Sequence, residues 1–201
     1  MENKVEIKVE SKKDLFSELL TLRKDIAREQ KRGLHFISAS VVIWGLILCI
    51  HASSMPILQK NLYTFCCSAP LVVLAYWISK LIGVDFQGKS NPLTALGLLF
   101  TLNQLLYILI AMWVYAAVPD KMLMVYAMIF GAHLLPYGWL YQSKSYYIFS
   151  FVVTIGVLVL GLSCSTAIVA CFMFVIEFIF CCCLVVENRM EKRDESRKTP
   201  L

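Results

Sequence analysis

Polar side chains recur near the middle of the long apolar stretches of this chain, where they could bind a proton or a small polar solute. Glu177 is the only carboxylate inside any of these stretches. A charged side chain at the centre of a bilayer costs at least about 2.5 kcal/mol on insertion scales, so it requires a structural or functional reason. The other polar residues at a similar depth, or one turn away, are Asn103, Gln104, Tyr107, His133, Tyr137 and Thr154.

Together these residue types suit a site near the midplane of a membrane. Desolvation disfavours the charged form of a carboxyl group, so we expect Glu177 to take up and release a proton. His133 titrates near neutral pH and could exchange a proton with it. Asn103 and Gln104 offer hydrogen-bond donors and acceptors to a solute. Midplane sites built from several helices are where transporters bind solutes and coupling ions.

The alternative is that these side chains only hold helices together. Hydrogen bonds between polar side chains of membrane helices contribute about 0.6 kcal/mol each on average. Residues at the same depth need not touch one another, so the sequence leaves both interpretations open. Glu177 argues for a functional site more strongly than the rest, because contacts between helices rarely need a carboxylate. Ala127 and Gly131, four residues apart, predict that another helix approaches closely there.

Six apolar stretches must position these residues, and we predict that each crosses a membrane as a helix. The chain has 201 residues, of which 59% are hydrophobic and only 16% are charged. A helix needs about 20 residues to cross about 30 Å of hydrocarbon, and it satisfies its own backbone groups there. The predicted spans are residues 34–52, 62–82, 93–117, 121–141, 146–162 and 164–186.

Charged segments flank this predicted six-helix transmembrane domain, residues 34–186. Residues 1–33 form a basic tail that contains an amphipathic helix at about 12–32, and residues 187–201 form a second charged tail. Apolar side chains recur on one face at i, i+4, i+7 and i+11: Leu15, Leu19, Leu22 and Ile26. Such a helix suits an anionic membrane surface or another helix. The predicted fold is an all-α, polytopic bundle of six transmembrane helices preceded by this helix.

The distribution of basic residues predicts the orientation. Of the 19 lysines and arginines, only Lys60 and Lys121 lie in connections on the side opposite both tails. Cytoplasmic segments carry an excess of Lys and Arg, so we expect both termini in the cytoplasm and the chain in the cell membrane. The net charge of +5 therefore marks a membrane side and does not indicate nucleic acid.

Motifs typical of enzymes are missing from the sequence. It contains no H-E-x-x-H, G-x-S-x-G, P-loop or G-x-G-x-x-G, so we do not expect an enzyme or a cofactor. The eight cysteines show no paired C-x-x-C spacing, and no metal site is predicted. The expected partners are the lipid bilayer, a small solute or a proton, and a second copy of the chain or another membrane protein.

The stretch His133-Leu-Leu-Pro-Tyr-Gly-Trp-Leu-Tyr-Gln-Ser-Lys144, together with the six-span layout, resembles a family of small bacterial multi-pass membrane proteins of unknown function. The resemblance implies a bacterial membrane, but no activity and no site residue. Two functions stay open. One is a small solute or ion-coupled transporter with a polar site around Glu177. The other is a non-enzymatic membrane regulator or assembly partner that acts through the amphipathic helix.

Overall fold

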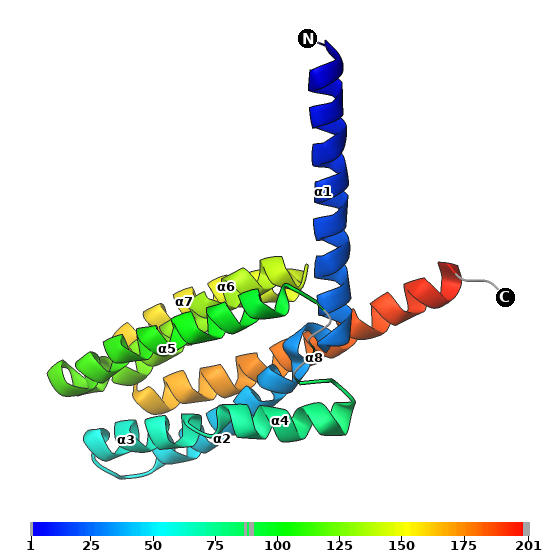
Figure 1. Ribbon diagram of the computed structural model, residues 1–201. Helices are drawn as coiled ribbons and strands as arrows, with labels where there is room; N and C mark the ends of the chain where they lie inside the picture. The colour runs from blue at the N-terminus through cyan, green and yellow to red at the C-terminus, as the bar shows by residue number, and fades with distance from the viewer. Residues whose placement is uncertain (1, 87, 89–90, 199–201) are drawn as a thin grey trace.

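The computed structural model describes residues 2–86, 88 and 91–198, which are almost entirely helical and contain no strand (Figure 1). This confirms the predicted all-α fold of a polytopic membrane protein. The α-helices of the described part are α1 Glu2–Glu29, α2 Leu34–Ala52, α3 Ile57–Ser68, α4 Leu71–Ile82, α5 Thr94–Ala117, α6 Met122–Leu140, α7 Lys144–Ser163 and α8 Thr166–Lys198. The short 3-10 helices are η1 Lys31–Gly33 and η2 Pro119–Lys121.

The second predicted span is broken. Five helical segments of the described chain are long and apolar enough to cross a membrane on their own. Residues 62–82, predicted as one helix, instead belong to α3 and α4, which are bent by 41° at the break between them. Pro70 lies at this break, where its ring and its missing N–H prevent a continuous helix. Residues 62–82 therefore form a bent pair of helices in place of one continuous helix, and the described chain has six candidate spans if this pair counts as one.

The long helices lie side by side in two groups (Figure 1). α5, α6 and α7 form one group, in which α6 and α7 have the most extensive contact of any helix pair described. α2 packs against α8, and α3 and α4 lie along α2. Two clusters of buried apolar side chains fill the bundle: one includes Leu134, Tyr146 and Phe180, and the other includes Trp44 and Met173.

Glycines let α6 and α7 approach closely. A Cβ atom added at Gly131 would lie 2.7 Å from Val153 Cγ1 and 3.0 Å from the backbone nitrogen of Thr154. A Cβ atom at Gly138 would lie 3.0 Å from the ring of Tyr147. Ala127, one turn before Gly131, is fully buried. The close helix approach predicted at Ala127 and Gly131 is therefore confirmed, and the approaching helix is α7.

The two ends of the chain form more helix than expected. α1 begins at Glu2, and α8 continues through most of the predicted charged tail to Lys198. α1 ends at Glu29, three residues early, because Lys31, Arg32 and Gly33 have φ angles of 45°, 52° and 67°. This left-handed turn changes the chain direction, so that α1 runs across the long helices at the end of the bundle where α8 also leaves it (Figure 1). We call this the α1 end.

Candidate functional site

Glu177 lies inside the bundle and faces α2. Its side chain is fully buried, and Ser40 Oγ lies 2.5 Å from its Oε2 atom. Its other oxygen, Oε1, has no hydrogen-bond partner among the described residues. On α8, Glu177 shares a buried face with Met173 and Phe180, which belong to different apolar clusters. The carboxyl group therefore lies where the two halves of the apolar core meet.

The Ser40 hydroxyl has two acceptors within reach. Its Oγ atom lies 2.9 Å from the carbonyl oxygen of Ile37, in addition to its contact with Glu177. A hydroxyl group has only one hydrogen to donate. If Glu177 is ionised, Ser40 must choose between the two acceptors. If Glu177 is protonated, its own O–H donates to Ser40 Oγ, and Ser40 donates to Ile37. Only with Glu177 protonated can the Glu177–Ser40 contact and the Ser40–Ile37 contact both be hydrogen bonds.

His133 does not belong to this site. No hydrogen bond or ion pair joins it to Glu177 within the described part of the chain; its Nδ1 atom lies 3.2 Å from the carbonyl oxygen of Phe130. It contributes instead to a pocket of about 210 Å³ between α5 and α6. The lining residues of this pocket are Phe100, Asn103, Tyr107, Ala132, His133 and Pro136. The structure thus brings together three of the predicted polar residues, but places them away from the carboxylate.

The remaining predicted residues have local roles. Tyr137 donates a hydrogen bond to the carbonyl oxygen of Gly97 at 2.9 Å, and its hydroxyl lies 2.8 Å from that of Thr101, so it ties α6 to α5. The Thr154 hydroxyl lies against Gly131 and has no hydrogen-bond partner among the described residues. Gln104 is half-buried on α5. The predicted residues therefore do not form a single constellation in the bundle.

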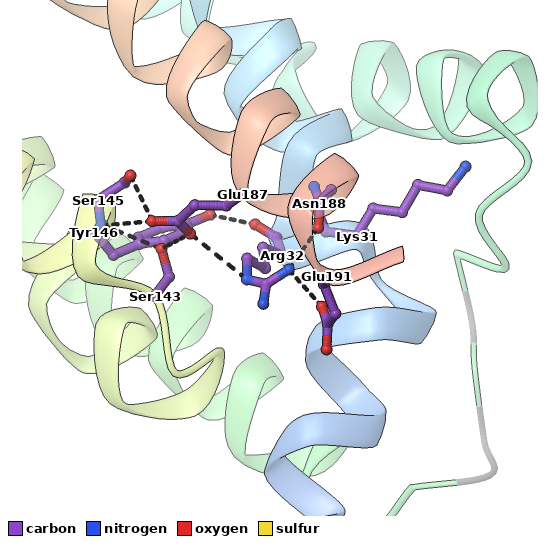
Figure 2. Close-up of polar contacts among 8 residues, drawn as sticks. All are labelled: Lys31, Arg32, Ser143, Ser145, Tyr146, Glu187, Asn188 and Glu191. Atoms are coloured by element: carbon purple, nitrogen blue, oxygen red, sulfur yellow. Dashed lines mark hydrogen bonds and ion pairs between the residues drawn. The ribbon is translucent and has the colours of Figure 1, made fainter. Parts of the chain in front are cut away.

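A polar cluster at the α1 end was not predicted from the sequence. Figure 2 shows Arg32 between α8 and the start of α7. Its Nη1 atom lies 2.8 Å from Glu191 Oε2 and donates to Asn188 Oδ1 at 2.8 Å, and its Nε atom lies 3.6 Å from Glu187 Oε2. The side chains of Arg32, Glu187 and Glu191 are 11%, 19% and 15% exposed. These are largely buried ion pairs, and their loss should therefore be costly.

The same cluster fixes the turn after α1 and the start of α7. Glu187 accepts hydrogen bonds from Ser143 Oγ at 2.6 Å and from the backbone and hydroxyl of Ser145 at 3.0 and 2.7 Å (Figure 2). The backbone of the left-handed turn is hydrogen-bonded to α7 as well: the Tyr146 hydroxyl donates to the backbone carbonyl oxygen of Arg32 at 2.8 Å. The signal for this cluster was available: Arg32 and Glu187 are the basic and acidic residues nearest to the start of the first apolar stretch and the end of the last one.

The opposite end of the bundle carries its own polar contacts. His51 Nε2 lies 3.0 Å from Thr64 Oγ1, and Lys60 donates to the backbone carbonyl of His51 at 3.0 Å. Asn61, fully buried, donates to the carbonyl oxygen of Pro119 at 2.8 Å, and Lys121 donates to that of Gly161 at 2.7 Å. These bonds join the ends of helices and the connections at this end of the bundle. Among the described residues, no three His, Cys, Asp or Glu side chains are grouped so that they could hold a metal ion.

The packed apolar helices and the carboxyl group within them define a polytopic membrane protein with a polar site inside its helical bundle. The chain belongs to a family of unknown function, DUF7010, whose sequence model matches residues 19–187. The match agrees with the predicted membership of a family without an assigned function, and the bacterial source stays a prediction. No curated protein and no solved structure matches the chain. The matched region begins at Leu19 and ends at Glu187, so it includes both Glu177 and Arg32.

Proposed function

We propose that the protein is a small ion-coupled membrane transporter in which Glu177 binds the coupling proton. The observation that carries this proposal is a fully buried carboxyl group, deep in a membrane helix, with one oxygen beside Ser40 and the other without a hydrogen-bond partner in the described part of the chain. A side chain that served only to join α2 and α8 would not need a carboxylate. An ionisable residue inside a membrane protein is by default a candidate for an ion pathway.

Ser40 gives the site a way to respond to the proton. With Glu177 protonated, Ser40 donates to the carbonyl oxygen of Ile37 inside its own helix. Without the proton, the hydroxyl turns towards the carboxylate and leaves the carbonyl oxygen of Ile37 without this donor. Loss of the proton therefore reverses the donor in the contact between α2 and α8 and changes the hydrogen bonding within α2. Such a change can bias one arrangement of packed helices over another, as alternating access requires.

Replacing Glu177 with glutamine is expected to abolish proton-coupled movement without unfolding the protein. The amide has the same shape and can still accept a hydrogen bond from Ser40, but it cannot release a proton at any physiological pH. The test uses purified protein in proteoliposomes with an imposed pH gradient, and it screens a panel of small charged and polar solutes by solid-supported electrophysiology. We expect solute-dependent currents from the wild-type protein and none from Glu177→Gln.

Asp120→Asn is the matched control, because it neutralises an exposed carboxylate in η2, away from the buried site. It should keep the wild-type currents. If Glu177→Gln carries the same solute-dependent current with the same pH dependence as the wild type, Glu177 is not the coupling site and the proposal is wrong. Elution of the variant as a single species in detergent would show that loss of current is not loss of fold.

A second function, that of a non-enzymatic regulator or assembly partner acting through α1, is favoured by the way α1 is held. Arg23 donates to the carbonyl oxygen of Trp139, Asn91 to that of Leu22 at 2.7 Å, and Gln142 to that of Leu20 at 3.0 Å. A transporter should tolerate removal of residues 2–18, which lie outside the matched family region, and should lose function with Glu177→Gln. A regulator should show the reverse.

The proposed orientation places the α1 end in the cytoplasm of the cell. Both tails leave the bundle at this end (Figure 1), as expected for an even number of membrane crossings, with the bent α3–α4 pair counted as one. The excess of basic residues in the same segments supports this orientation. Under this proposal Glu177 is reached by protons from either side in turn, and the Arg32 cluster lies on the cytoplasmic side.

A further inference from the structure

We propose that residues 12–22 of α1 lie in the lipid–water interface beside the bundle. Their apolar side chains hold them there, and the net charge of the helix does not. α1 runs across the direction of the long helices and extends past the bundle (Figure 1). Because those helices cross the membrane, a helix running across them at one end lies along the membrane surface. The helix is thus placed as an interfacial helix would be.

The apolar face of α1 points towards the bilayer. Ile26, near the end of α1, is 2% exposed and packs into the apolar cluster of the bundle. Leu19 and Leu22, on the same face, are half-buried, and Leu15 is 67% exposed. These four side chains form one continuous apolar stripe, which is covered by the bundle at Ile26 and uncovered at Leu15. The uncovered part faces the same side as the covered part. Beside the bundle, that side is filled by lipid.

Aromatic side chains place this helix at the depth of the interface. The guanidinium group of Arg23 lies 4.3 Å from the centre of the Trp139 ring, at the end of α6. Near the end of α4, Lys80 lies over the rings of Tyr76 and Trp77, and all three side chains are exposed. Trp and Tyr gather at the boundary between hydrocarbon and headgroups. The docked part of α1 is thus level with an aromatic belt.

The charges of α1 argue against attraction by anionic lipid as the main force. Its sequence contains seven basic and seven acidic residues. Asp14 and Glu18 lie on one flank of the apolar stripe, and Lys13 and Lys24 lie on the other. Burial of Leu15, Phe16 and Leu19 among lipid chains is then the favourable contribution. Phe16 and Leu20, 60% and 37% exposed, widen the face that lipid would cover.

Hydrogen–deuterium exchange of the full-length protein tests this placement. The protein is incorporated as a single copy per nanodisc of palmitoyl-oleoyl phosphatidylcholine, and exchange is followed in peptides that cover residues 12–22. We expect these amides to exchange at least tenfold more slowly in the wild type than in the double variant Leu15→Asp/Phe16→Asp. The matched control, Ser17→Asp/Thr21→Asp, adds the same charge to exposed positions on the other face and should keep the wild-type protection.

Peptides from α6 and α7 must exchange alike in all three proteins, which shows that the bundle is intact. Equal protection with phosphatidylglycerol added to the nanodisc supports insertion through apolar side chains, and protection that appears only with this lipid would overturn it. Protection that appears only when two copies share a disc would assign the stripe to a second copy and overturn the proposal. Fast exchange of residues 12–22 in the wild type would overturn it as well.

Discussion

Replacing Arg32 with alanine is expected to destabilise the protein by about 3 kcal/mol, the lower end of the range for breaking a buried ion pair. The change leaves Glu187 and Glu191 without their counter-charge, although both side chains are more than four-fifths buried. It also removes the donor to Asn188 Oδ1, so the turn after α1 loses one of its hydrogen bonds to α8, while Asn188 Nδ2 still donates to the carbonyl oxygen of Lys31. The measurement is the free energy of unfolding in a titration with sodium dodecyl sulfate.

Arg189→Ala is the matched control for this prediction, because Arg189 is exposed on α8, the helix that carries Glu187 and Glu191. Removing an exposed charge away from such features should change stability by no more than about 0.5 kcal/mol. In the double variant Arg32→Ala/Glu191→Ala, part of the loss should be recovered, because the second change removes one uncompensated carboxylate. Equal stability of Arg32→Ala and Arg189→Ala would show that the cluster contributes nothing to the fold.

Replacing Gly131 with leucine should force α6 and α7 apart. The first added carbon would already lie 2.7 Å from Val153 Cγ1 and 3.0 Å from the backbone nitrogen of Thr154, which cannot move unless α7 moves. Overpacking of this kind costs about 1 to 3 kcal/mol, and leucine adds three further carbons in the same direction. We expect Gly131→Ala to lower the free energy of unfolding and Gly131→Leu to lower it further.

Gly97→Ala is the control, since a Cβ atom at Gly97 would meet only Leu140 Cδ2, at an ordinary contact distance of 3.4 Å. Alanine is favoured over glycine within helices by about 0.8 to 1 kcal/mol, so this variant should be neutral or more stable. The close approach of α6 and α7 is contradicted if Gly131→Leu and Gly97→Ala unfold at the same detergent concentration.

The helical architecture could be predicted because long apolar runs in a membrane permit few other structures. The break at Pro70 was less accessible, since a proline in a membrane helix can also be accommodated as a kink. The packing of α3 and α4 on α2 accompanies the bent pair in the structure. The left-handed turn at Arg32 was harder still, because neither Lys31 nor Arg32 favours positive φ. Contacts from α7 and α8, far along the chain, hold that turn.

In the candidate site, residues at a similar predicted depth in the membrane do not all contact one another. Glu177 was identified from its type and position alone, and its burial follows from the apolar face that it shares on α8. Its partner Ser40 could not be found in this way, because serine is common in membrane helices. His133 has a similar predicted depth, but its pocket is formed with α5, the helix that a short connection joins to α6. Depth alone does not say which face of α6 His133 occupies, and therefore which helix it meets.

Difference infrared spectroscopy of the purified protein tests most directly whether Glu177 carries the coupling proton. A protonated carboxyl group gives a carbonyl stretching band that a carboxylate or an amide does not give. We predict one such band at neutral pH that is absent in Glu177→Gln, shifted in Ser40→Ala because a hydrogen-bond partner is lost, and unchanged in Asp120→Asn. A spectrum in which Glu177→Gln removes no carboxylic acid band at neutral pH would contradict the account, because Glu177 would then not hold the proton that the account assigns to it.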